Sequence, residues 1–310
     1  SNNMLLASLN DNFTTSGVGH LVSDNDSNSD DLITALSPGL SYCKDNPFLK
    51  GYYPTLIEKY ERRYYKWRIS GQFGRLYSIL TDYFYSEGVH PEDPSAEDGD
   101  FMTYHTKIGH IFQNIVYPKE NIFPCKTGLK SYGNKILCGL EWLKEEEDCI
   151  IYSLGSNNEF DFEQSVKICV GHHQEPDDSN RNLQLRLFPY SRPPKGWKSA
   201  AAIPLIKSAK LESYHTIMKR LNQTRVDVLK LDIEGAEYGV FADLLQWGTT
   251  RGSLPYQLAF ETHWWHRDIG HAMLTLQMFE ELWKAGYRFI SNVPQRDSSC
   301  FEWTALRVFC

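Results

Sequence analysis

The stretch Val226-Asp-Val-Leu-Lys-Leu-Asp-Ile-Glu-Gly-Ala-Glu-Tyr-Gly-Val-Phe241 decides the fold. Between Val226 and Ile233 an apolar side chain occurs at nearly every second position. The run has little of the polar alternation of a strand that meets water on one face. We therefore expect a central parallel strand, buried on both sides, that leads directly into a helix.

Carboxylates follow this predicted strand. Asp232 ends it, and Glu234 and Glu237 come in the turn and at the start of the helix. In an open α/β sheet, ligands bind outside the carboxyl ends of the strands, so these side chains lie where binding and catalysis usually occur. Gly235 allows a tight turn or a close approach of the backbone to a ligand. The sequence thus predicts a functional site at this end of the sheet.

A second block, Ile150-Ile-Tyr-Ser-Leu-Gly-Ser-Asn-Asn-Glu-Phe-Asp-Phe-Glu163, also runs from an apolar strand through a turn into a helix. Together with Leu229-Lys-Leu-Asp-Ile-Glu-Gly-Ala-Glu237, it resembles the FkbM-type methyltransferases and the related animal methyltransferase-like proteins. The segment Cys125–Cys138, which ends in Lys-x-x-Cys, resembles the part that precedes the first strand in the animal branch. Two blocks in the right order are more specific than either alone.

The resemblance implies a class I enzyme that uses S-adenosylmethionine. Such an enzyme has a doubly wound, Rossmann-like α/β sheet, and its last strand is antiparallel. The apolar, alternating run 301–309 fits that strand. We expect the methyltransferase domain over residues 125–310. A polar N-terminal arm over 1–46 and an aromatic-rich helical cap over 47–124 precede it, because aromatic residues recur there at helical spacings.

Gly155 ends the first predicted strand, and a glycine there lets the backbone pass close under the methionine part of the cofactor. The Ser and Asn side chains that follow supply hydrogen bonds and a start for the next helix. The loop is not G-x-G-x-x-G, which disfavours a dinucleotide. The resemblance implies that the residues that contact the cofactor are Tyr152, Ser153, Gly155, Ser156, Asn157, Asn158, Glu163, Cys169 and Asp232.

Methyl transfer is an in-line displacement, so the protein mainly aligns the acceptor, and a hydroxyl acceptor must also lose a proton. His263 is our candidate general base, because a free imidazole titrates near about 6.5 and we place it at the mouth of the pocket. Asp232 and Glu234 are the alternatives for this role or for orientation. Packing of His263 against Trp264 and Trp265 is the purely structural alternative.

The predicted strand Gln257–His266 also offers Glu261, Trp264 and His266 to a substrate. Its carboxyl end should neighbour that of the strand that ends in Asp232. Glu261, His263, His266 and His271 offer carboxylate and imidazole ligands. Their spacing matches no standard metal motif, so we expect no metal.

The spacing after the second block departs from the family pattern. The helix start 162–166 is followed at once by Lys167-Ile-Cys-Val-Gly171, which resembles the third strand of the family. A parallel crossover needs about a dozen residues or more, so the second strand, with the acid that would hold the ribose hydroxyls, is absent. We hypothesise that a segment is missing between Val166 and Lys167, which a Cα–Cα distance of about 3.8 Å there would exclude. A continuous chain favours the alternative of a non-catalytic binding protein with a methyltransferase-like fold.

The composition limits the partners. The 32 basic and 39 acidic residues give a net charge of −7, which argues against a broad surface for nucleic acid or anionic membranes. We expect no membrane span, since no apolar run reaches about 18 residues. We expect the acceptor to be a hydroxyl-bearing small molecule or a glycan, and the oligomeric state stays open.

The seven cysteines show no paired C-x-x-C spacing, and we expect most of them in the core with at least one thiol free or bonded outside the chain. Three sequons, at Asn12, Asn25 and Asn222, permit glycosylation in a secreted protein. The compartment, cytoplasm or secretory lumen, stays open.

Overall fold

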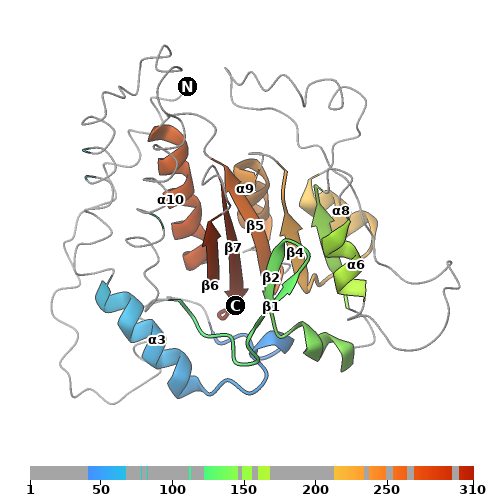
Figure 1. The fold of residues 1–310 in the computed structure, drawn as a ribbon, viewed down its shortest axis with the longest axis horizontal. Coiled ribbons are helices and arrows are strands. Elements are labelled where there is room, and N and C mark those ends of the chain that lie inside the picture. The colour runs from blue at the N-terminus through green and yellow to red at the C-terminus, as the bar shows by residue number, and fades with distance from the viewer. Residues whose placement is uncertain are drawn as a thin grey trace, which may run out of the picture.

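The computed structural model describes residues 41–67, 78, 82, 112, 122–145, 149–155, 160–167, 213–233, 237–248, 254–263, 269–294 and 300–310. Within these ranges the chain forms a mixed α/β structure with a five-stranded sheet and a separate two-stranded hairpin (Figure 1). The elements are η1 (Pro47–Leu49), α3 (Pro54–Trp67), β1 (Leu129–Tyr132), β2 (Lys135–Cys138), η6 (Leu140–Glu145), β3 (Ile151–Leu154), α6 (Asp161–Lys167), α8 (Tyr214–Arg220), β4 (Val228–Leu231), α9 (Glu237–Gly248), β5 (Gln257–His263), α10 (Ile269–Lys284), β6 (Tyr287–Pro294) and β7 (Cys300–Arg307).

The sheet has the order β3-β4-β5-β7-β6. β4 lies between β3 and β5 and is parallel to both, and all of its residues are buried. β7 is antiparallel to its neighbours β5 and β6. The predicted central parallel strand and the predicted antiparallel last strand are therefore confirmed, and the sheet is consistent with a Rossmann-like methyltransferase.

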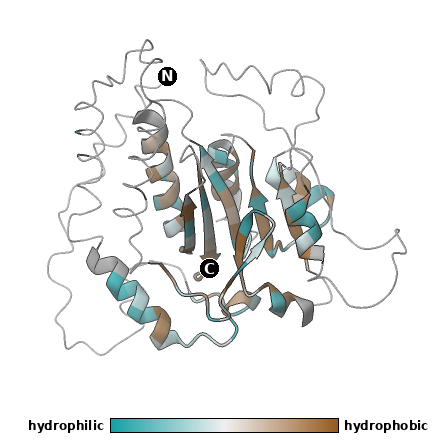
Figure 2. Cartoon of the chain, viewed as in Figure 1, coloured by the Kyte–Doolittle hydropathy of each residue, from teal (hydrophilic) through white to brown (hydrophobic). Residues whose placement is uncertain are grey.

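The two faces of β4 belong to two core clusters. Leu229 and Leu231 pack in a cluster with residues of α8, α9 and α10, whereas Val228 packs in a second cluster with residues of η1, α3, β2 and α6. Successive side chains of a strand point to opposite faces, so this alternation gives β4 an apolar layer on each side. Figure 2 shows α10 with many hydrophobic residues and α3 with mostly hydrophilic ones. We call the second side the hairpin face, because β2 lies on it.

The part of the predicted cap that the structure describes packs on the same core as the sheet. Phe48 and Ile57 belong to the cluster of the hairpin face. Arg288 of β6 forms a bidentate pair with Glu61 of α3, with Nε–Oε1 and Nη2–Oε2 distances of 2.5 and 2.7 Å. The rest of the cap and the arm lie outside the described residues, so the domain boundaries stay predictions.

Val166 and Lys167 both belong to α6. The hypothesis of a missing segment between them stays a prediction. Residues 168–212 lie outside the described ranges, and within those ranges β3 is an edge strand of the sheet.

Among the described residues, two disulfides are present. Cys43 pairs with Cys310, and Cys125 pairs with Cys138. The sequence interpretation was incomplete, since it treated the cysteines mainly as core residues. Disulfides of this kind persist in oxidising compartments.

No helix among the described residues is both long enough and apolar enough to span a membrane.

Candidate functional site

Five ionisable side chains meet on the hairpin face, at the carboxyl edge of β4 and β5. Period-two alternation places Lys230 and Asp232 on one face of the β4 segment, and Glu261 of β5 lies directly opposite Glu302 of β7 in the ladder. Lys135 reaches them from β2. We call these residues the carboxyl-edge cluster: Lys135, Lys230, Asp232, Glu261 and Glu302.

Lys135 is the centre of the cluster. Its ammonium donates to Asp232 Oδ2 at 3.0 Å and to Glu302 Oε1, and it lies 3.9 Å from Glu261 Oε2. The Lys135 side chain is only 1% exposed, whereas that of Asp232 is 17% exposed. Two carboxylates placed directly opposite each other repel, so the ammonium offsets an arrangement that would otherwise be unfavourable. Asp232 is therefore the member of this group that is most open to a ligand.

Glu261 and Asp232 have very different pKa values. Burial and the neighbouring carboxylates Asp232 and Glu302 raise the pKa of Glu261 to about 8, although His263 and Lys135 act against this. Burial also acts to raise the pKa of Asp232, but Lys135, a hydrogen bond from Glu261 and Lys230 outweigh it, and that pKa falls to about 2. At neutral pH Glu261 is thus a proton donor beside an ionised Asp232, and such a separation is typical of functional sites.

The two lysines also differ. Burial lowers the pKa of Lys135, but the carboxylates around it outweigh burial and raise that pKa. Burial lowers the pKa of Lys230, with Asp232 acting against the shift and Lys135 adding to it. The Lys230 ammonium donates to the carbonyl of Gly155, and this bond links the end of β4 to the loop after β3.

Gly155 lies directly against the backbone after β4. Its φ is +77°, and a Cβ atom there would lie 1.7 Å from the carbonyl oxygen of Asp232. Any other residue would therefore push the two strand ends apart. The predicted need for glycine is explained here by contact within the chain.

The predicted cofactor residues on β3 and α6 are linked to each other. Ser153 donates to Glu163 Oε1 at 2.5 Å, and Tyr152 donates to the side chain of Gln223. The second oxygen of Glu163 is buried and has no hydrogen-bond partner among the described atoms. A buried acceptor of this kind needs a donor, which an amino or hydroxyl group of a ligand supplies. With the ionised Asp232, the residues present fit a cofactor that carries positive charge and donor groups.

The sequence predicted that His263 lies at the mouth of a pocket. In the structure His263 is buried instead. Its side chain is 3% exposed and lies between two carboxylates. Nδ1 is 3.6 Å from Glu237 Oε1, and Nε2 is 3.6 Å from Glu261 Oε2. The predicted convergence of Asp232, Glu261 and His263 at one end of the sheet is confirmed, whereas their roles stay predictions.

Seven residues of the predicted site lie outside the described ranges. They are Glu234, Ser156, Asn157, Asn158, Cys169, Trp264 and His266. Three residues with a clear role in the geometry, Lys135, Lys230 and Glu302, were missed. A charged residue in a short apolar strand was the available signal for each, in Lys-Ile-Leu-Cys138, Val-Leu-Lys-Leu231 and Phe-Glu-Trp303.

Metal-ligating groups also come together at this edge. Among the described residues, ligand atoms of Asp232, Glu261 and Glu302 lie within 4.8 Å of one another, as do those of Glu261, His263 and Cys300. The Lys135 ammonium already lies among the three carboxylates. The chain therefore supplies its own cation at that position.

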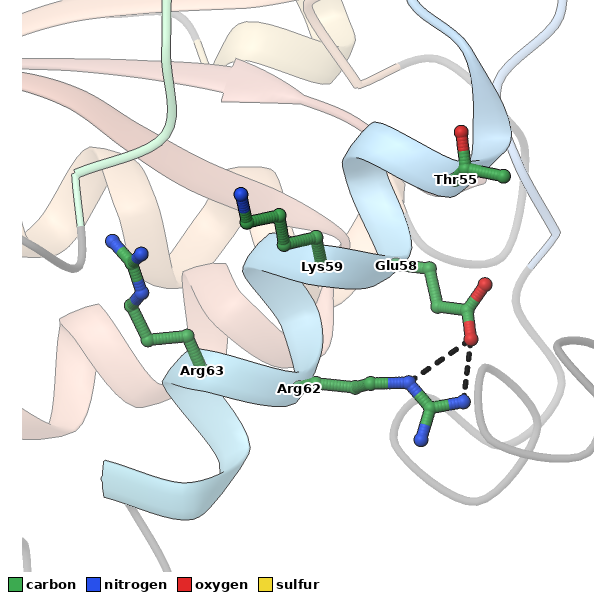
Figure 3. Close-up of a pocket in the computed structure, with 5 residues that line it drawn as sticks. All are labelled: Thr55, Glu58, Lys59, Arg62 and Arg63. Atoms are coloured by element: carbon green, nitrogen blue, oxygen red, sulfur yellow. Dashed lines mark hydrogen bonds and ion pairs between the residues drawn. The ribbon is translucent and has the colours of Figure 1, made fainter. Parts of the chain in front are cut away.

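A depression of about 500 Å³ lies elsewhere, on α3 (Figure 3). Arg62 donates to Glu58 across it, with an Nε–Oε1 distance of 3.0 Å. A solvent-accessible ion pair at this helical spacing stabilises a helix by only about 0.3–0.5 kcal/mol. The depression shares no residue with the carboxyl-edge cluster. All of its lining residues come from α3: Thr55, Glu58, Lys59, Arg62 and Arg63.

Comparison with known proteins agrees with this geometry. A family model described as "Methyltransferase domain" matches residues 81–307, which is well over half of the chain. No curated protein matches the sequence. The matched region contains the whole five-stranded sheet and the carboxyl-edge cluster. The chain therefore belongs to this methyltransferase family.

Proposed function

We propose that the protein transfers a methyl group from S-adenosylmethionine to a hydroxyl oxygen of a small molecule or a glycan. The family match supports methyl transfer, and S-adenosylmethionine is the usual methyl donor of such domains. The observation that carries the proposal is the convergence of Asp232, Glu261 and His263 at one strand edge, where Lys135 contacts both Asp232 and Glu261, and Glu261 Oε2 lies 3.6 Å from His263 Nε2.

The proposed cofactor contacts follow the charges. S-adenosylmethionine, when bound, supplies an electrophilic methyl group on a positively charged sulfur. Asp232 stays ionised well below neutral pH and is the most exposed carboxylate of the cluster, so it is the proposed partner of a positive group. Glu163 offers the buried acceptor oxygen beside β3. The roles of residues 156–158, Glu234 and Cys169 in the same site remain part of this proposal.

The proposed base is His263. A hydroxyl acceptor must lose a proton, whereas a neutral amine attacks with its own lone pair and can lose its proton later. Glu237 and Glu261 lie on either side of the imidazole, with Glu237 Oε1 3.6 Å from Nδ1. A carboxylate at the position of Glu237 stabilises the positive charge that the imidazole acquires on taking a proton. This arrangement favours oxygen over nitrogen as the acceptor atom. Trp264 and His266 are the proposed substrate contacts next to it.

The test is methyl transfer from isotope-labelled S-adenosylmethionine to a panel of polyols, glycans and matched amines. We expect transfer to hydroxyl acceptors, and we expect His263→Gln to lower kcat by about 10²–10⁴-fold while binding of S-adenosylhomocysteine is kept. Transfer to amines that is insensitive to His263→Gln would contradict the choice of oxygen. Absence of both transfer and cofactor binding would leave the alternative, a binding protein that retains the fold.

The two disulfides favour the secretory lumen over the cytoplasm as the compartment of the protein, since cytosolic reductants keep thiols reduced. A lumenal location agrees with a glycan acceptor. Mass spectrometry of the protein from its native source, with thiols blocked before lysis, would show both pairs oxidised. Finding all four thiols blocked would contradict this assignment.

A further inference from the structure

The hairpin of β1 and β2 brings Lys135 into the carboxyl-edge cluster. Its strands are joined by the two residues Gly133 and Asn134, and Tyr132 pairs with Lys135. Gly133 has a φ of +58°, and a Cβ atom there would lie 2.5 Å from the backbone nitrogen of Phe162. The turn therefore packs against the start of α6, the helix that follows the proposed cofactor loop.

The tip of the hairpin also contacts Asp232 directly. Asn134 Nδ2 donates to Asp232 Oδ2 at 3.4 Å, and this same oxygen accepts from Lys135. Asn134 and Lys135, neighbours in the hairpin, thus both donate to one carboxylate oxygen of Asp232, the residue that we propose binds the cofactor. A carboxylate held by two donors loses rotational freedom, which preorganises it for a ligand.

The base of the hairpin is attached to the sheet at three points. The side chain of Gln257 accepts from Cys138 N at 2.8 Å and donates to Cys138 O at 3.0 Å. Thr304 donates to the carbonyl of Ile136 at 2.5 Å. The Cys125–Cys138 disulfide closes the segment covalently. These contacts fix the position of Lys135 relative to β5 and β7.

We propose that Lys135 is a positioning residue of the methyltransferase site, which holds Asp232 in place for the cofactor by neutralising the carboxylates around it. This inference rests on the proposed function. The charged and titratable groups around Lys135 are Lys230 from β4, Asp232 directly after it, Glu261 and His263 from β5, and Glu302 from β7. Without the ammonium, three acids would share one buried space, and the proton shared between them would move toward Asp232.

The experiment compares Lys135→Met, Lys135→Arg and Lys130→Met by calorimetric titration with S-adenosylhomocysteine over a range of pH. Lys130 is the matched control, since it lies on the same hairpin but is 54% exposed and pairs with Glu141. We expect Lys135→Met to raise the Kd at least tenfold. The loss of binding that accompanies acidification, which we call the acid limb, should begin at a higher pH in this variant. Lys135→Arg should restore part of the binding, and Lys130→Met should leave both quantities unchanged.

Equal Kd and equal acid limbs for Lys135→Met and Lys130→Met would overturn the inference. If Lys135→Met does not fold, the double variant Lys135→Met/Glu302→Gln replaces it in the experiment. This double variant removes one positive and one negative charge, and it is compared with Glu302→Gln alone. If the unaltered protein does not bind S-adenosylhomocysteine, the proposed function fails. The role of Lys135 is then decided by a carbon-13 NMR titration of Asp232, in which Lys135→Met must raise its pKa.

A second inference concerns Asn222, the only one of the three sequon asparagines that lies in the described ranges. Asn222 follows α8, is exposed and has a φ of 53°. Thr224, the third residue of the sequon, is exposed as well. The α8–β4 connection enters β4 at its amino end, so a group on Asn222 lies away from the carboxyl edge.

We propose that Asn222 carries an N-linked glycan. Its amide nitrogen would lose a proton and bond to the anomeric carbon of a sugar on a lipid pyrophosphate carrier, which leaves. The disulfides indicate a compartment where this reaction occurs. Mass spectrometry of the peptide from the native protein, before and after enzymatic deglycosylation, should show glycan at Asn222, and Thr224→Ala should abolish it. An unmodified Asn222 in that protein would overturn this proposal.

Discussion

Two buried cations in this protein meet their carboxylates in different ways. Arg288 faces one carboxylate, that of Glu61, and its remaining guanidinium nitrogen donates to the carbonyls of Trp283 and Tyr287 at 3.0 and 2.7 Å. Its guanidinium also lies 4.7 and 4.9 Å above the rings of Trp283 and Phe309. Lys135 instead faces three carboxylates, one of them partly exposed.

We assign a structural role to the buried charge of Arg288 and a functional role to that of Lys135, because their surroundings differ. The Arg288–Glu61 pair balances its charges and joins α3 to β6, so it contributes to holding the fold. The carboxyl-edge cluster sets three acids against two lysines around a strand end, which separates the proton affinities of Asp232 and Glu261. It leaves the ionised Asp232 partly exposed, which suits a ligand that carries positive charge.

The largest expected effect is on stability. Glu61→Ala leaves the Arg288 guanidinium buried and uncompensated, so we expect the free energy of unfolding to fall by about 3–5 kcal/mol. Glu58→Ala on the same helix is the control and should cost under about 1 kcal/mol, because its partner Arg62 is far more open to solvent than Arg288. Chemical denaturation measures both variants. If Glu61→Ala lowers the free energy of unfolding no more than Glu58→Ala does, the Arg288–Glu61 pair does not have the structural role that we assign to it.

The disulfides give the next effect. Replacing both cysteines of either pair by Ala should lower the free energy of unfolding by about 2–4 kcal/mol. Only the Cys125–Cys138 replacement should also raise the Kd for S-adenosylhomocysteine, by about tenfold, because that disulfide closes the hairpin that carries Lys135. Thermal unfolding and calorimetric titration of the two double variants separate the effects. Equal Kd values would show that the hairpin base has no influence on the site.

A smaller effect concerns the dependence of stability on pH. The folded protein holds the Glu261 proton up to a pH of about 8, whereas an unfolded Glu releases it near 4.5. The folded state therefore binds more protons in this window, and the contribution of Glu261 to stability is lost as the pH rises from about 4.5 to about 8. Asp232 has the opposite sign, since its contribution is present above 3.8 and is lost as the pH falls toward about 2.

Glu261→Gln should therefore flatten the fall of the denaturation midpoint between pH 4.5 and pH 8. Glu58→Gln, on α3 and outside the carboxyl-edge cluster, should leave that slope unchanged. Denaturant midpoints across this range give the slopes. The same slope in Glu261→Gln and the unaltered protein would contradict the assignment of a raised pKa to Glu261.

The sequence predicted the centre of the fold and part of the site. β4 was recognisable because a strand buried on both faces reads as a nearly continuous apolar run. Asp232, Glu261 and His263 could be grouped because parallel neighbours end at the same edge of a sheet. Each of these predictions depended on a local pattern and one general rule of topology.

The rest depended on contacts between segments far apart in the chain. Nothing in Lys-Ile-Leu-Cys138 says which strands the hairpin will cover, so Lys135 could not be connected with Glu302, 167 positions later. The partner of Arg288 is 227 positions away. The disulfide partners were equally open, because several pairings are compatible with seven cysteines. The burial of His263 also follows from tertiary packing, not from its place in the strand.

The most direct test of the central claim, that the carboxyl-edge cluster binds the methyl-donor cofactor, is calorimetric titration of the full chain with S-adenosylhomocysteine, alongside Asp232→Asn. The account predicts binding at one site per chain, and at least a tenfold rise of Kd in Asp232→Asn with a far smaller loss of stability than in Glu61→Ala. Unchanged affinity in Asp232→Asn, or no binding by the unaltered protein, would contradict it.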